Sequence, residues 1–209
     1  QNAGWAQTAY LGEDANFNGV LDPGEDNDGD GVIDRFILPT PPDVPNIRIV
    51  PGDQVVDVYW TRNSEFSVDP ISNEMDFEGW RIYKTQIGFD QDSISALENE
   101  LELVAEFDYD GNNLFFDTGL DAVRLTEPVT FEDDTNEYVY RYSFDNMQNG
   151  WQHAIAVTAF DRGDDVNNVI SLESAPLANV QRVFPGKLPN ADMEQEEPFV
   201  YPNPYYAGA

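Results

Sequence analysis

The sequence predicts an all-β fold, an antiparallel β-sandwich, and three observations support this prediction. First, several short segments alternate large apolar and polar residues, which is the pattern of a strand with one buried face. Second, turn-forming residues separate these segments, and a helical pattern is confined to one or two turns within residues 92–99, with Ser93 or Ser95 as the N-cap. Third, 41% of the 209 residues are hydrophobic and 13% are aromatic, which is enough for a sizeable core.

Each expected strand has its own local signal. Residues 55–60 end in Trp60, and residues 77–84 alternate clearly around Trp80. Residues 138–144 place four aromatic side chains on one face. Because both tryptophans fall at alternating strand positions, we expect them in the core. The full set of expected strands is residues 55–60, 77–84, 102–107, 138–144, 153–160 and 179–184.

Charge excludes several classes of function. Forty acidic against ten basic residues give a net charge of −30 at pH 7. This field repels nucleic acids and anionic membranes, and no apolar run approaches the roughly 18 residues of a spanning helix. We therefore expect no nucleic acid partner and no membrane insertion. The absence of cysteine excludes disulfides and Cys-ligated metals. A single histidine, His153, excludes a His-rich metal site, and we expect it to be structural.

Composition divides the chain into five parts. An apolar N-terminal segment precedes an acidic stretch, in which residues 13–34 hold eight acids and no base. A Pro-rich linker follows, which is stiff and cannot be helical. Most β-branched and aromatic residues come after it, and a tail of loop composition closes the chain. The five parts are residues 1–12, 13–37, 38–45, 46–184 and 185–209.

The acidic stretch contains a twelve-residue repeat, because the pattern of residues 14–22 recurs at residues 26–34. Oxygen-bearing side chains occupy positions 1, 3, 5 and 9, with glycine at 6 and an aliphatic residue at 8. This is the pattern of an EF-hand-type calcium loop, in which the carbonyl of position 7 adds a ligand. The sequence therefore predicts an N-terminal calcium-binding loop pair with calcium as its cofactor. The expected ligands are Asp14, Asn16, Asn18, the Val20 carbonyl, Asp22 and Glu25 at one ion, and Asp26, Asp28, Asp30, the Val32 carbonyl and Asp34 at the other.

The two loops differ at position 12. Glu25 completes the first loop as a bidentate ligand, whereas Ile37 stands at this position of the second. The second ion must therefore recruit another oxygen, a water or a carboxylate from the first loop. Since eight carboxylates repel one another, we expect the segment to be largely disordered without the cation. The pair resembles the calcium loops of dockerins and thrombospondin type 3 repeats; the alternative is a solvated acidic linker.

Four segments of the β region resemble a fibronectin type III module. They are NIRIVPGDQVVDVYW (46–60), FEGWRIYK (77–84), IAVTAFDRG (155–163) and ESAPLANVQRV (173–183). The resemblance implies a fibronectin type III/Ig-like antiparallel β-sandwich, lengthened here by residues 61–76 and 85–136. It departs from the family at Ile155, where a tyrosine is usual, so the tyrosine-corner hydrogen bond is absent or supplied by another residue such as Trp151 or His153.

The two ends of the chain suggest assembly. Residues 200–209 resemble the segment that opens C-terminal domains of large secreted proteins of the Bacteroidetes group. Residues 1–12 and 199–206 are apolar and aromatic, and we expect them to pair with a sheet edge of a neighbouring copy or domain. Prolines 202 and 204 make the N-terminal segment the better candidate strand. The alternative is that both are stubs without a partner.

The motifs favour a non-catalytic protein. No nucleophile elbow, HExxH, P-loop or Gly-rich dinucleotide turn occurs, and among forty carboxylates a glycosidase-like pair carries no information. We expect a calcium-stabilised structural or adhesive module, secreted or on the cell surface, and in its sharper form a subunit of an extracellular filament or layer joined through terminal strands. The alternative is a carbohydrate-binding or spacer module of a secreted hydrolase. The acidity also suits a saline habitat, and both origins of the charge stay open.

Overall fold

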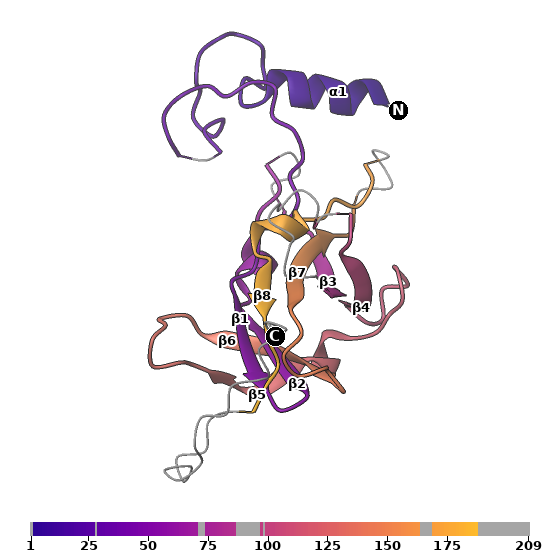
Figure 1. The fold of residues 1–209 in the computed structure, drawn as a ribbon. Coiled ribbons are helices and arrows are strands. Elements are labelled where there is room, and N and C mark those ends of the chain that lie inside the picture. The colour runs from indigo at the N-terminus through magenta and orange to yellow at the C-terminus, as the bar shows by residue number, and fades with distance from the viewer. Residues whose placement is uncertain are drawn as a thin grey trace, which may run out of the picture.

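The structure, a computed structural model, describes residues 2–27, 29–70, 74–86, 97, 99–163 and 169–187. Two four-stranded antiparallel sheets pack on a shared core as a β-sandwich, which confirms the predicted fold class (Figure 1). One sheet has the order β1-β2-β6-β5 and the other the order β4-β3-β7-β8. This is the two-sheet order of Ig-like sandwiches, with β4 added beside β3.

The predicted strands agree with six of the observed ones, and their ends differ by at most two residues. The strands are β1 (Ile47–Gly52), β2 (Val55–Trp60), β3 (Phe77–Gln86), β4 (Glu102–Asp108), β5 (Arg124–Val129), β6 (Tyr138–Asp145), β7 (His153–Asp161) and β8 (Gln181–Val183). The helical elements are α1 (Asn2–Leu11) and the short turns η1 (Asn63–Phe66), η2 (Leu120–Ala122) and η3 (Pro176–Ala178).

The strand pattern missed β5 and left β1 to the family resemblance. β5 contains Pro128 and pairs with β6 through a shifted register, so its sequence has the marks of an irregular edge strand rather than of period 2. Of the helical turns expected within residues 92–99, only residues 97 and 99 lie within the described part of the chain.

The N-terminal segment is helical, and its prediction as a pairing strand was wrong. Residues 2–11 form α1, because the segment has alanine, glutamine and leucine, no proline and no β-branched run. The other candidate strand, residues 199–206, lies outside the described residues.

Three aromatic rings form the centre of the sandwich. Trp60 from β2 stacks on Tyr140 from β6 with 5.6 Å between ring centroids, and Trp80 from β3 lies 6.1 Å from Trp60 and 5.4 Å from Tyr140. All three side chains are fully buried. The tryptophans therefore belong to the core, as predicted, and join the two sheets.

β7 is buried on both faces along its whole length. Val157 and its neighbours at alternate positions, Ile155 and Ala159, enter the core. On the other face Phe160 is covered by Phe115, with 4.9 Å between the rings, and by the guanidinium of Arg81. This second cover explains why polar and apolar residues alternate so weakly in this strand.

The Pro-rich linker is fixed to the sandwich. Pro42 and Pro45 are buried, the N–H of Thr40 donates to Asp69 at 3.0 Å, and the side-chain amide of Asn179 donates to the Pro45 carbonyl at 2.9 Å. The linker thereby leads to α1 and the acidic loops, which lie beyond one end of the sandwich (Figure 1).

Candidate metal centre

The first predicted calcium loop folds around Asp14, which is fully buried. The Asp14 carboxylate accepts hydrogen bonds from the N–H of Asn18 at 2.9 Å and of Gly19 at 3.0 Å. The N–H of Val20 donates to the side-chain oxygen of Asn18 at 2.7 Å. Gly19 has a φ of 76°, which suits the sharp turn after position 5. The chain from position 1 to position 7 thus wraps around the first acid of the loop.

The second loop repeats these contacts at the same positions. The N–H of Gly31, at position 6, donates to the Asp26 carboxylate at 3.2 Å, and the N–H of Val32 donates to Asp30 at 2.7 Å. Gly31 has a φ of 77°. Asp28, at position 3, lies outside the described residues. The twelve-residue repeat of the sequence is therefore also a repeat of backbone structure.

The remaining side chains of the first loop converge. The amide nitrogens of Asn16 and Asn18 both donate to Oδ2 of Asp22 at 2.7 Å. The carboxylate of Glu25 accepts from the N–H of Asp22 at 2.9 Å and from that of Asn16 at 3.4 Å. Hydrogen bonds thus join positions 3, 5, 9 and 12 of the first loop.

Position 7 is occupied by Val20 and Val32, whose side chains are both 58% exposed. Leu21 and Ile33, which follow at position 8, are half-buried. Because the predicted ligand at position 7 is the backbone carbonyl, an exposed apolar side chain there is compatible with the prediction.

Arg35 brings the one positive charge into this acidic region of residues 13–37. Its guanidinium forms an ion pair with Asp14 and lies 5.9 Å from the centre of the Phe17 ring. Tyr10 of α1 contacts both Phe17 and Phe36, with ring centroids 6.3 and 5.2 Å apart. These contacts attach the helix to the loops.

Glu13 is a residue of this site that the sequence analysis missed. It is 2% exposed, and its carboxylate accepts from the N–H of Asn27 at 2.8 Å and of Asp34 at 3.0 Å. Its own N–H donates to the Asp34 carbonyl at 2.9 Å. A signal was present, because Glu13 precedes position 1 of the first loop as Glu25 precedes position 1 of the second.

The donor set fits calcium by its chemistry. The predicted donors are oxygens of carboxylates, amides and backbone carbonyls, the hard ligands that this ion prefers. Across the described residues, no three or more His, Cys, Asp or Glu side chains form a group that could hold a metal ion. The predicted donors of the first loop also include the amide oxygens of Asn16 and Asn18, at positions 3 and 5.

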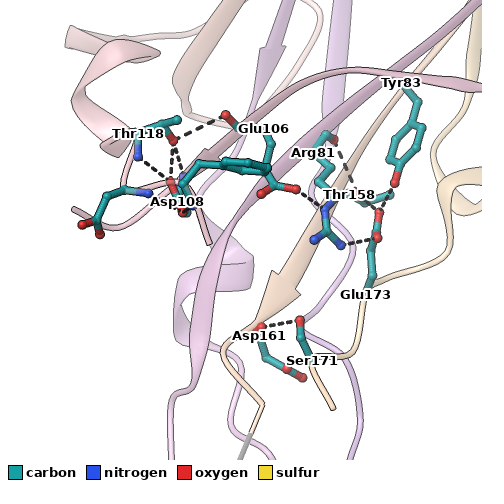
Figure 2. Close-up of polar contacts among 11 residues, drawn as sticks. Arg81, Tyr83, Glu106, Asp108, Thr118, Thr158, Asp161, Ser171 and Glu173 are labelled. Atoms are coloured by element: carbon teal, nitrogen blue, oxygen red, sulfur yellow. Dashed lines mark hydrogen bonds and ion pairs between the residues drawn. The ribbon is translucent and has the colours of Figure 1, made fainter. Parts of the chain in front are cut away.

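A second polar cluster lies on the outer face of the β4-β3-β7-β8 sheet (Figure 2). Arg81 of β3 donates to Glu106 of β4 and to Glu173, both at 2.6 Å. Glu173 also accepts from the hydroxyls of Tyr83 at 2.7 Å and Thr158 at 2.6 Å. Burial opposes the charged guanidinium, but the hydrogen bonds to the two glutamates outweigh it and raise the pKa of Arg81. Burial, then the neighbouring Glu173, raises the pKa of Tyr83. Each charge therefore has a partner within the cluster.

His153 is buried at the start of β7, where the sequence analysis expected a structural histidine. Among the described residues, neither ring nitrogen has a hydrogen-bond partner. Burial, followed by the charge of Lys84, lowers the pKa of His153, which favours the neutral imidazole.

Comparison with known proteins identifies no family. No family model matches the chain, and no curated protein matches it. A solved structure of Astrotactin-2, described as a conserved vertebrate-specific and perforin-like membrane protein involved in neuronal development, is similar at 13% identity with a TM-score of 0.36. The match covers 80% of this chain and 25% of that one, so the chain spans about a quarter of its length. Within the described residues, no helix is long and apolar enough to cross a membrane.

Proposed function

We propose that this chain is a calcium-stabilised, non-catalytic structural or adhesive module of a secreted or cell-surface protein. The observation that carries the proposal is the pair of acidic loops, which share two hydrogen bonds. In each loop the N–H at position 6 donates to the carboxylate at position 1, and the N–H at position 7 donates to the side-chain oxygen at position 5. Media outside cells supply calcium at the concentrations that such modules use. The scarcity of lysine and the net charge of −30 agree with that setting.

In this proposal the sandwich is a fibronectin type III-like module of a large bacterial surface protein, similar to those of the Bacteroidetes group. The sheet order supports the assignment, since it is the Ig-like order. The burial of Trp60 and Trp80 between the sheets supports it as well.

Assembly uses an open sheet edge in this proposal. On β6, the N–H of Arg141 donates to the Val123 carbonyl. Beyond Arg141, no described residue pairs with β6 on the side of the sheet where β5 lies. Because alternate residues of a strand direct their backbone groups to opposite sides, the N–H and carbonyl of Ser143 face the same open edge. A strand from a second copy would satisfy them.

The hollow beside this edge has a volume of about 380 Å³, and two arginines line it. Its lining residues are Phe107, Ala122, Val123, Arg124, Leu125, Arg141, Tyr142 and Ser143. Asp57 pairs with Arg141, whereas Arg124 lies against the ring of Tyr140. Two arginines in a chain of this acidity suit a strand that carries acidic side chains.

Sedimentation at millimolar calcium tests the assembly. We expect the full chain to associate with rising concentration and Arg124→Glu to remain monomeric at the same concentrations. Arg182→Glu is the matched control on the opposite sheet, and it should associate as the unaltered chain does. Monomeric profiles for all three proteins would contradict assembly through this edge and leave a spacer module.

The carbohydrate-binding alternative has less support. Trp60 and Trp80, the tryptophans at alternating strand positions, are buried and so offer no platform for a sugar. Trp151 is 46% exposed, but it lies in the turn before β7 and forms no row with them.

Calorimetry with the full chain in calcium-free buffer tests the proposed function. We expect two bound calcium ions, and Asp14→Ala and Asp26→Ala should each weaken one of them by roughly 10- to 100-fold or more. Glu132→Ala, which removes an exposed acid outside the loops, is the matched control and should leave both affinities unchanged. Binding heats that none of the variants alters would show that the loops are not the calcium sites.

A further inference from the structure

His153 is a buried titratable group that the proposed function leaves without a role. The residue is 4% exposed, and among the described residues neither Nδ1 nor Nε2 has a hydrogen-bond partner. It lies two positions before Ile155, so its side chain is on the core face of β7. Protonation of this imidazole would add a second N–H donor and a full charge where no acceptor is present.

The charge nearest to the imidazole also opposes protonation. Lys84 lies two positions after Ile82 on β3 and is therefore on the same core face. Its Nζ lies 3.9 Å from Sδ of Met147 and 5.3 Å from the centre of the Phe144 ring. The single histidine of this acidic chain thus has a lysine beside it, and burial and this lysine both lower the pKa of His153.

The other elements around His153 do not offset the lysine. On β8, Arg182 alternates to the face opposite that of Val183. On β6, Asp145 is exposed and follows the core residue Phe144, so it is on the outer face. Residues 146–152, the turn before β7, contain no charged residue. The imidazole is therefore stable in this position in its uncharged form.

β8 is the short edge strand that closes over this histidine (Figure 1). Three residue pairs join β8 to β7, and one of them is His153 with Val183. Directly opposite residues of two strands share a face, so the buried side chain of Val183 lies beside the imidazole. Detachment of β8 would expose the imidazole to water, where protonation has no such cost.

We propose that His153 is a pH-sensitive latch that controls the pairing of β8 with β7. At neutral pH the uncharged imidazole allows β8 to close the sheet. In acid the imidazole takes up a proton and stabilises the state in which β8 is detached. The backbone groups of residues 153–155 are then free to pair with a strand from another molecule. This device depends on neither the acidic loops nor the edge of β6.

The direction of the pH effect follows from the two states. With β8 closed, the pKa of His153 lies below the ordinary value of 6.5, whereas in the detached state it returns toward that value. Detachment therefore takes up a proton below pH 6.5. The equilibrium constant for detachment should rise by up to about 10-fold per pH unit in this range, and it should be constant at higher pH.

NMR of the full chain at saturating calcium, between pH 7.5 and pH 5, tests the latch. His153 is the one histidine of the sequence, so its ring signal reports protonation without overlap. We expect the hydrogen-exchange protection factors of residues 153–155 and 181–183 to fall by up to about 10-fold per pH unit below pH 6.5. In His153→Phe, which keeps a ring but cannot be charged, they should stay constant.

The two lysines of the chain supply a matched pair of further variants. Lys84→Met removes the charge beside the imidazole, so the pKa of His153 should rise toward 6.5 and the pH dependence of protection should become shallower. Lys187→Met removes an exposed charge that pairs with Asp53, and it should behave as the unaltered chain does. If His153→Phe does not fold, His153→Gln gives the same comparison with an uncharged side chain.

Three outcomes would overturn the proposal. A ring signal that titrates while the protection of β8 stays constant would show that His153 is protonated with the strand in place. The same pH dependence in the uncharged variant would assign the effect to carboxylates. An equal fall of protection in β2 and β3 would indicate unfolding of the whole sandwich rather than detachment of β8.

Discussion

Asp76 is a residue at which burial and neighbouring acids act together on the folded state. It is half-buried before β3, and burial, followed by the charges of Asp161 and Asp69, raises its pKa to about 6. The positive charge of Arg162 lowers the pKa of Asp76, but by less than burial and the two acids raise it. The folded protein therefore favours the protonated acid.

The sign of the pH effect follows from this shift. Because the folded-state pKa lies above the ordinary value of 3.8, the stabilising contribution of Asp76 is complete below pH 3.8 and is lost as the pH rises through 6. Asp76→Asn stays neutral at all pH values. We therefore expect it to raise the free energy of unfolding at pH 8 and to have almost no effect near pH 3.5.

Urea unfolding between pH 3.5 and pH 8, in the presence of chelator, measures this difference. Asp110→Asn removes an exposed acid and corrects for the general fall in net charge. A gain for Asp76→Asn that is the same at both pH values, or no larger than that of the control, would contradict the repulsion among the three acids.

At the scale of elements, Arg81 joins three segments of the chain. It links β3 to Glu106 on β4 and to Glu173, which follows β7, and it lies 4.2 Å from the centre of the Phe160 ring. This ion-pair cluster is mostly buried (Figure 2), so the carboxylates of Glu106 and Glu173 depend on the guanidinium for their balance of charge.

Removal of this cation should be costly. Arg81→Met keeps a side chain of similar length but leaves two carboxylates without a counter-charge, and we expect a loss of about 3–5 kcal/mol in the free energy of unfolding. Arg48→Met breaks the exposed pair with Asp133 and should cost less than about 1 kcal/mol. Denaturant unfolding of both variants checks the contrast, and equal losses would show that burial of the cluster contributes nothing.

At the scale of the whole molecule, the acidic loops and the sandwich differ in what holds them together. The aromatic centre of the sandwich comes from strands after residue 46. The loops have eight carboxylates within residues 13–34, and Arg35 supplies the nearest positive charge in the sequence. The loops should therefore need calcium, and the sandwich should not.

Calcium removal tests this division. We expect chelator to leave the near-ultraviolet circular dichroism of the buried tryptophans unchanged, since Trp60 and Trp80 lie in the sandwich. The same treatment should expose residues 13–37 to proteolysis, because the carboxylates then repel one another. Loss of the tryptophan signal in chelator would show that the sandwich depends on the metal.

The sequence by itself determined the features that depend on neighbours along the chain. The strands β2, β3 and β6 follow from a period of two residues, which any strand with one buried face must show. The matching turns of the two acidic loops follow from the twelve-residue repeat, because each turn is formed by contacts between residues no more than five positions apart. The burial of Trp60 and Trp80 follows from the same alternation.

Only the tertiary structure decided the features that depend on distant segments. The two loop residues that Glu13 contacts are 14 and 21 positions away, so no local pattern relates them. The outer face of β7 is buried by loops from elsewhere in the chain, and β5 pairs despite its proline because β6 offers an edge. α1 replaced a predicted strand, since apolar composition alone does not distinguish a helix from a strand in so short a segment. Contacts between distant residues depend on how all the strands are ordered, and that order is a property of the folded chain as a whole.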